Sequence, residues 1–170
     1  MASWQETRVT IVGPTIIKYQ GIYDFEKLLK EMQAWLKKTG YFIKYKDQTE
    51  EPKPQGTFIR MELICDRQPT PYFKFYIETE MVCRDQIEVI VEHNGKKQKR
   101  IKGDMELIVK AYVDKNYDNK FPSTLWGKFC RVMWERYVAY DSIKGFYGRI
   151  YSETYQFLDV IKAVLEGFKS

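Results

Sequence analysis

Apolar and polar residues alternate along three segments of the chain, residues 58–65, 72–83 and 105–113. The apolar side chains that share one side of these segments are Ile59, Met61, Leu63, Cys65, Phe73, Phe75, Ile77, Met81, Cys83, Met105, Leu107, Val109, Ala111 and Val113. A period of two residues is typical of antiparallel strands that bury one face and expose the other. We therefore predict a sheet with one apolar face.

Further segments extend the predicted sheet. They are residues 8–19, 41–46 and 87–92. Gly13-Pro14 interrupts the first of them, so it is either one bulged strand or two short strands, and proline favours the edge of a sheet. Asn94-Gly95 is typical of a two-residue hairpin turn. The prediction is an antiparallel sheet of about six strands, with residues 47–56 as a polar loop.

The clearest helical pattern covers residues 23–39. Asp24 is a candidate N-cap, and Gly40 suits the left-handed conformation that ends many helices. The apolar stripe of this segment consists of Phe25, Leu28, Leu29, Met32, Trp35 or Leu36, and Thr39. Because lysines occupy the opposite side, we predict an amphipathic helix that packs on the rest of the protein by this stripe.

The last quarter of the chain, residues 123–170, has helical periodicity and many aromatic side chains. A single helix of ~44 residues would be ~65 Å long. That length greatly exceeds the ~15 Å radius of gyration expected for a chain of this size. We therefore predict a break, most naturally at Gly145 and Gly148, since each glycine costs about 1 kcal/mol inside a helix. One kinked helix and two antiparallel helices both fit this pattern.

Together these elements predict an α+β fold in one domain, residues 1–170, with a long, kinked C-terminal helix packed on the sheet. The order strand, helix, strands and long C-terminal helix resembles the helix-grip fold of the START and Bet v 1-like proteins, which have two helices after the first strand. Through Tyr23-Asp24-Phe25, Trp35 and Gly40-Tyr41 the chain is also similar to uncharacterised small archaeal proteins. That second resemblance implies no function.

The helix-grip resemblance implies a cavity between the sheet and the C-terminal helix that holds an apolar ligand. The candidate lining residues are Met61, Leu63, Phe73, Phe75, Ile77, Met81, Tyr137 and Tyr140. Our first hypothesis is therefore a non-catalytic binding module for a hydrophobic small molecule or lipid. If the helix packs tightly on the sheet, the same residues are ordinary core.

The aromatic side chains of residues 123–170 spread over more than one side of the predicted helix. Arg131, Arg136 and Arg149 alternate with the rings, and arginine and aromatic residues are enriched in protein interfaces. Our alternative hypothesis is therefore a protein-interaction or self-associating module that uses the C-terminal helix to bind a partner or a second copy. The competing interpretation is a core face backed by solvated tyrosines.

The net charge of +5 is concentrated in one arm of the chain. Its cations are Lys96, Lys97, Lys99, Arg100 and Lys102, with no acid between residues 94 and 103. Such an arm can contact an anionic polymer, but it lacks the aromatic residues of a single-strand binder. Lysines on an edge strand also prevent aggregation, so solvation is the favoured interpretation and nucleic acid is not the expected partner.

Catalytic chemistry has little support. The single histidine, His93, has no second histidine to form a zinc site, and no glycine-rich phosphate-binding motif is present. A hairpin centred on Thr70 would place Glu62 opposite Glu78, where two carboxylates can share a proton, although solvated glutamates are the favoured interpretation. We therefore predict no metal, no cofactor and no enzymatic activity.

The three cysteines, Cys65, Cys83 and Cys130, lack metal-binding spacing and suit a reducing compartment as buried thiols. No apolar run reaches the ~18 residues needed to span a bilayer. Residues 1–6 lack the pattern of a secretory signal. We predict a cytoplasmic protein without a transmembrane segment.

Overall fold

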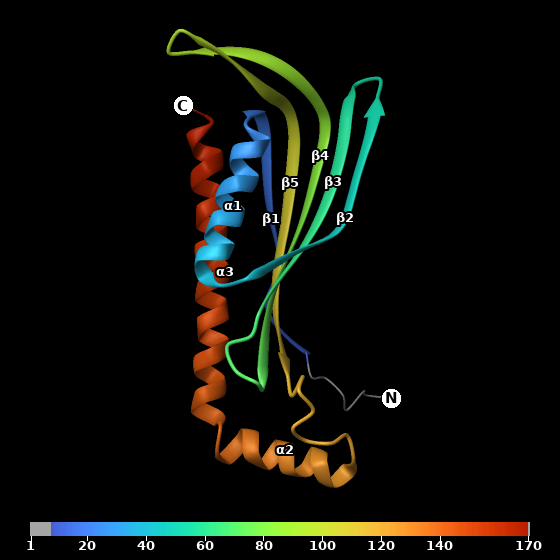
Figure 1. Ribbon diagram of the computed structural model, residues 1–170, viewed down its shortest axis with the longest axis vertical. Coiled ribbons are helices and arrows are strands. Elements are labelled where there is room, and N and C mark those ends of the chain that lie inside the picture. The colour runs from blue at the N-terminus through green and yellow to red at the C-terminus, as the bar shows by residue number, and fades with distance from the viewer. Residues whose placement is uncertain (1–7, 170) are drawn as a thin grey trace.

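The computed structural model describes residues 8–169 and has an α+β architecture. Residues 1–6, on which the prediction about a secretory signal rests, lie outside this range. The strands are β1 (Arg8–Tyr23), β2 (Phe42–Lys53), β3 (Gly56–Arg67), β4 (Phe73–His93) and β5 (Lys96–Lys115). The helices are α1 (Phe25–Thr39), α2 (Leu125–Tyr137) and α3 (Tyr140–Gly167). The elements form a long, curved sheet with helices on one face (Figure 1).

The sheet has five antiparallel strands in the order β1-β5-β4-β3-β2. Strands β2 to β5 follow one another in sequence, and β1 returns beside β5 at one edge. The edge position predicted from Pro14 is confirmed, and β1 is one strand with register shifts between Thr10 and Thr15. The predicted apolar face is also confirmed, because Leu63, Ile77 and Val109 are buried with their neighbours on that face.

The prediction of about six strands is wrong, because residues 72–83 and 87–92 belong to one strand. Within the long β4 the register with β5 shifts between Arg84 and Ile87. Asp85 at this bulge has a left-handed backbone with φ of 53°. A bulge lets a strand bend without ending. Beyond it, the β4–β5 hairpin curves over the end of the helices, as Figure 1 shows at the top.

The polar loop predicted at residues 47–56 is a hairpin. Strand β2 continues to Lys53, which pairs with Gly56 of β3. Proline has no backbone N–H, but β2 is an edge strand with no neighbour on its outer side, so a proline such as Pro52 is tolerated there. The backbone pairing, rather than apolar side chains, extends these strands.

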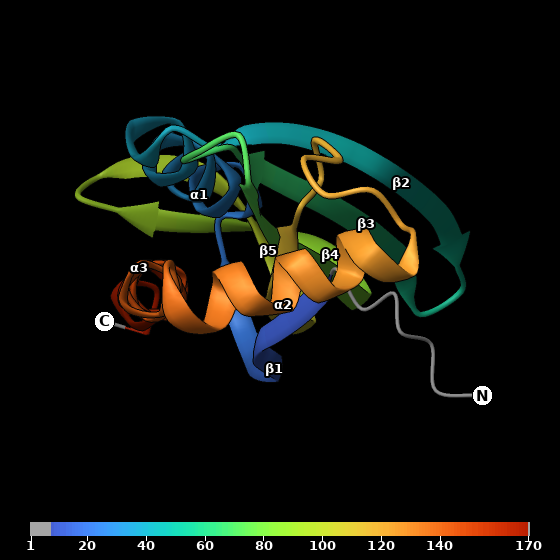
Figure 2. The same ribbon diagram turned by 90° about the horizontal axis from the view of Figure 1, so that it is seen from below.

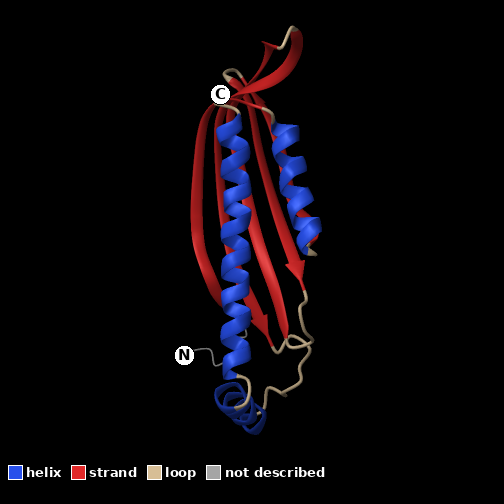
Figure 3. Ribbon diagram, turned by 90° about the vertical axis from the view of Figure 1, so that its left-hand side faces the viewer, coloured by secondary structure: helices blue, strands red, loops and turns tan. Residues whose placement is uncertain are grey.

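Helices α1 and α3 lie side by side on one face of the sheet (Figures 1 and 3). In α1 the side chain of Asp24 accepts the amide of Lys27 at 3.0 Å, and Gly40 ends the helix with φ of 87°. Both capping predictions are confirmed. Leu28, Met32 and Leu36 of α1 are buried, so the predicted stripe packs on the core.

The predicted break in the C-terminal segment exists, but its predicted position is wrong. Gly145 and Gly148 lie inside α3, and the chain turns instead between Tyr137 and Tyr140. Figures 1 and 2 show α2 lying across one end of the molecule, in a direction different from that of α3. The arrangement is therefore two helices, and they are not antiparallel.

A buried carboxylate connects α3 to the sheet and to the end of α1. Glu153 accepts hydrogen bonds from the Tyr41 hydroxyl at 2.7 Å and from the Arg67 guanidinium at 2.8 Å. Arg67 also donates to the carbonyl of Thr39 at 2.6 Å. Burial raises the pKa of Tyr41, with the charge of Glu153 adding to the shift, so the hydroxyl remains a donor. This network fixes α3 along the sheet.

Replacing Glu153 with alanine is expected to lower the free energy of unfolding by about 3 kcal/mol, because the nearly buried Arg67 would lose its counter-charge. Denaturant titration of both proteins measures this difference. Asp159→Asn, at an exposed position of the same helix, is the control and should change stability by less than about 0.5 kcal/mol. Equal effects of the two substitutions would contradict the anchoring role.

Candidate functional site

The residues predicted to line a cavity do not all come together. The strand members are buried under the helices and are Met61, Leu63, Phe73, Phe75, Ile77 and Met81. Tyr137 and Tyr140 lie at the turn between α2 and α3, where they are 70% and 51% exposed. Two tyrosines that point to solvent cannot close a cavity over these strand residues. Of the predicted set, only Phe73 lines the pocket described next.

A pocket lies at the turn between α2 and α3. It has a volume of about 630 Å³ and opens to solvent. Its lining residues are Thr70, Pro71, Tyr72, Phe73, Asp118, Lys120, Trp134, Val138, Ala139, Ser142 and Phe146. They come from the β3–β4 loop and the start of β4, the loop before α2, both helices and the turn between them. We call this site the elbow pocket.

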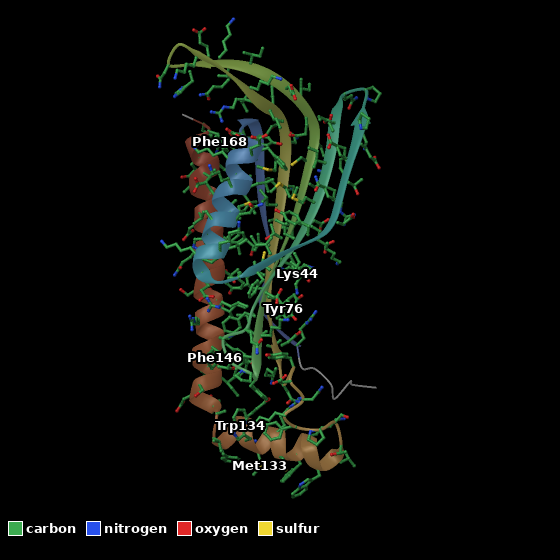
Figure 4. The ribbon with its side chains drawn as sticks, in the orientation of Figure 1. Lys44, Tyr76, Met133, Trp134, Phe146 and Phe168 are labelled. Atoms are coloured by element: carbon green, nitrogen blue, oxygen red, sulfur yellow. The ribbon has the colours of Figure 1, made fainter. Side chains whose placement is uncertain are left out.

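Aromatic side chains build the wall of the elbow pocket. Tyr72 lies 5.0 Å from Trp134 and 4.9 Å from Phe73 between ring centroids. Phe73 in turn lies 4.9 Å from Phe146 of α3. Figure 4 shows Trp134 and Phe146 at the same end of the molecule, one on each helix. These edge and tilted contacts give a rigid apolar surface.

The loop before α2 holds the polar rim of the elbow pocket. Asn116 has a left-handed backbone with φ of 53°, and its side chain exchanges two hydrogen bonds with the backbone of Phe121. The backbone N–H of Asn116 donates to the carbonyl of Tyr72 at 2.8 Å, which connects the loop to the chain just before β4. Lys120 is thereby placed 5.1 Å from the centre of the Trp134 ring, where cation and ring attract each other.

A half-buried carboxylate holds α2 over the elbow pocket. Glu135 accepts hydrogen bonds from the Tyr72 hydroxyl and, at 2.9 Å, from Lys115. Burial raises the pKa of Tyr72, and the hydrogen bond to Glu135 adds to the shift. Gly127 provides close contact at the other end of the helix, since a Cβ there would lie 2.1 Å from the carbonyl oxygen of Pro122. Helix α2 is therefore fixed at both ends.

The carboxylate pair considered from the sequence has a different register. Glu62 pairs with Glu80 instead of Glu78, so the hairpin of β3 and β4 is centred on Pro71 instead of Thr70. This slip of two residues keeps every side chain on its predicted face. Glu62 binds Lys46 at 2.8 Å. Burial opposes the charge of Glu78, but hydrogen bonds from Tyr112 and Lys110 outweigh it and lower its pKa. Sharing a proton between two carboxylates would raise the pKa of one of them, so the lowered pKa of Glu78 does not support a shared proton.

The predicted basic arm is partly neutralised within the protein. Arg100 pairs with Asp24 at the start of α1, and Lys99 lies 3.8 Å from Glu88. Among residues 8–169, the other arm cations, Lys96, Lys97 and Lys102, have no ion-pair partner. Two of the five cations that were predicted to contact an anionic partner are therefore already paired with a carboxylate of the protein.

Sequence reasoning missed most of the elbow pocket. Trp134 and Phe146 stood out only as members of an aromatic helix, and Thr70 and Pro71 only as part of the break between two predicted strands. The adjacent rings of Tyr72 and Phe73 beside Pro71 were the sole local signal. Their partners are more than sixty residues away, so no local pattern could pair them.

The site can surround an apolar molecule and offer it one ammonium, one carboxylate and small hydroxyl groups at the rim. Across residues 8–169, no group of three or more His, Cys, Asp or Glu side chains is arranged to hold a metal ion. Nor does any helix in that range combine the length and apolarity needed to cross a membrane. The chain matches no family model, no curated protein and no solved structure.

Replacing Glu135 with alanine should speed chemical modification of Cys130, which is half-buried on α2, by about tenfold. The reason is that α2 loses its hydrogen bonds from Tyr72 and Lys115 and therefore separates from the sheet more often. Cys65 and Cys83 should stay unreactive, because burial raises their pKa values to about 12 and about 11. Timed labelling with a maleimide, read by mass spectrometry, separates the three sites.

Val132→Ala, an exposed change on the same helix, is the control for this labelling experiment and should leave the rate unchanged. An unchanged rate in the Glu135 variant would show that the carboxylate does not hold α2. Faster labelling of all three cysteines would indicate global unfolding instead.

Proposed function

We propose that this protein is a non-catalytic binding module that holds a hydrophobic small molecule in the elbow pocket, between the end of the sheet and the C-terminal helices. The observation that carries the proposal is the pocket of about 630 Å³ with an aromatic wall. Its volume lies within the roughly 300–1,000 Å³ that is typical of small-molecule sites. Apolar lining with few polar groups is also typical of such sites.

The topology supports the same proposal. A strand, a helix, an antiparallel meander and a C-terminal helix on the inner face of the sheet follow the order of the helix-grip fold. The protein has five strands instead of the predicted six, and its C-terminal segment is two helices instead of one kinked helix. It also has one helix after β1, where the helix-grip fold has two. The assignment to the helix-grip fold is therefore part of the proposal.

The ligand class follows from the walls and the rim. Tyr72, Phe73, Trp134 and Phe146 favour an apolar, ring-containing or branched body that stacks on aromatic faces. Lys120 is exposed at the rim and favours one anionic or strongly polar group on that body. The buried strand residues beneath α3 serve as the core that keeps this wall rigid.

Substituting tryptophan for Ser142 should abolish ligand binding, because this exposed residue lines the pocket and the new ring would occupy it. We expect at least about a tenfold weaker affinity for the apolar dye anilinonaphthalene sulfonate, measured by fluorescence titration. Native mass spectrometry of the purified wild-type protein should also show a bound small mass that the variant lacks.

Ser152→Trp is the matched control, since Ser152 is exposed on the same helix and lies outside the pocket. It should keep both the dye affinity and the bound mass. Equal dye binding by the two tryptophan variants would place the dye elsewhere and contradict the proposal.

A further inference from the structure

The outer side of α2 is an apolar surface that nothing in the described part of the chain covers. Its exposed side chains are Leu125, Trp126, Phe129, Val132, Met133 and Tyr137. Leu125 is 88% exposed and Trp126 is 73% exposed. Folded proteins rarely leave a contiguous apolar patch of this kind without a binding role. We call these six residues the α2 outer face.

The α2 outer face is distinct from the elbow pocket. Spacings of three and four residues place Trp126, Phe129, Met133 and Tyr137 together on one side of the helix. Trp134, on the opposite side, contacts the aromatic wall of the pocket. Figure 4 shows Met133 and Trp134 on different sides of α2, and Figure 2 shows the helix lying across the end of the molecule. The outer face is therefore presented at one end of an elongated protein.

The unpaired charges on α2 itself have one sign. The only acid of α2 is Glu135, and it is paired on the inner side with Lys115, with Arg131 nearby at 3.6 Å. Lys128 and Arg136 have no ion-pair partner among residues 8–169. Arg136 lies one residue before Tyr137, with its guanidinium 6.0 Å from that ring. The free charges of the helix are thus cationic.

We propose that the α2 outer face docks onto the surface of an anionic lipid bilayer. An amphipathic helix with tryptophan, phenylalanine and leucine on one side and free cations lies in the plane of the bilayer interface. Tryptophan and tyrosine favour the level of the headgroups. Lys128 and Arg136 would meet lipid phosphates there, since long cationic side chains extend to the interface while their stems remain in contact with apolar groups.

The charges favour a bilayer over a second copy of the chain. A symmetric pair uses the same surface twice, so both copies would bring Lys128 and Arg136 into the contact. The outer face contains no carboxylate to pair with them. An anionic headgroup layer supplies that counter-charge along the whole helix, which is about 20 Å long. This proposal does not rest on ligand binding in the elbow pocket.

Sedimentation with vesicles of equal parts phosphatidylcholine and phosphatidylserine tests the proposal with the full-length protein. The wild type should bind these vesicles and should bind pure phosphatidylcholine vesicles much more weakly. Changing both Lys128 and Arg136 to glutamine should weaken binding about 25-fold, roughly fivefold for each cation lost. Raising the salt concentration should weaken the wild type by screening the same charges.

The matched control changes Lys96 and Lys97 to glutamine. This pair removes the same charge from the β4–β5 hairpin, which Figure 1 shows at the opposite end of the molecule from α2. It should alter vesicle binding by less than about twofold, because those residues would remain farther from the surface than a screening length. If both double variants weakened vesicle binding equally, the effect would depend only on net charge and not on α2, and the proposal would be wrong.

The apolar contribution is tested by Trp126→Ser combined with Met133→Ser. Both side chains are exposed, so the thermal unfolding curve should match the wild type while vesicle binding is lost. If the wild type is instead a dimer without vesicles and this variant is a monomer, a second copy occupies the face and the proposal is wrong. Ser142→Trp should still bind vesicles, which separates this test from that of the elbow pocket.

Discussion

The carboxylate of Glu153 is the interaction on which the arrangement of the other elements depends. It is nearly buried, and hydrogen bonds from Tyr41 and Arg67 connect α3 to β3 and to the end of α1. An ionised group in such a place is tolerated only when its partners are all present. Because Arg67 also binds the last turn of α1, one network determines how both helices lie on the sheet.

With α3 held in this position, its apolar side chains meet the inner face of the sheet along its length. Ile150, Phe157 and Leu158 are completely buried there, and Phe146 lies against Phe73 near the sheet's end. Beyond that point the helix has no more sheet to cover. The turn before Tyr140 occurs at this place, and α2 crosses the end of the sheet instead of extending past it.

Helix α2 therefore has two apolar sides with different surroundings. Its inner side contacts the aromatic wall of the elbow pocket, and Glu135 fixes it there. Its outer side is exposed and carries cations without acids. The two proposals use opposite sides of the same helix, so a ligand in the pocket and a bilayer under α2 would be separated by about one helix diameter, roughly 10 Å.

Alternation and capping allowed much of the fold to be predicted from local sequence. The apolar face of the sheet, the edge position of β1 and both ends of α1 follow from patterns only a few residues long. The strand count was wrong because the bulge at Asp85 bends β4 without ending it. Backbone pairing also made the polar residues 47–56 a hairpin, which no side-chain pattern indicated.

The sequence by itself determined which side chains are apolar, how they repeat, and that the last quarter must break. Only the tertiary structure decided where it breaks, because no glycine or proline occurs between Tyr137 and Tyr140. That position depends on where the sheet ends and on Glu135 binding residues far away in the chain. The elbow pocket depends on the same long-range contacts, since Phe73 and Phe146 meet only after the strands have paired and α3 has packed on them.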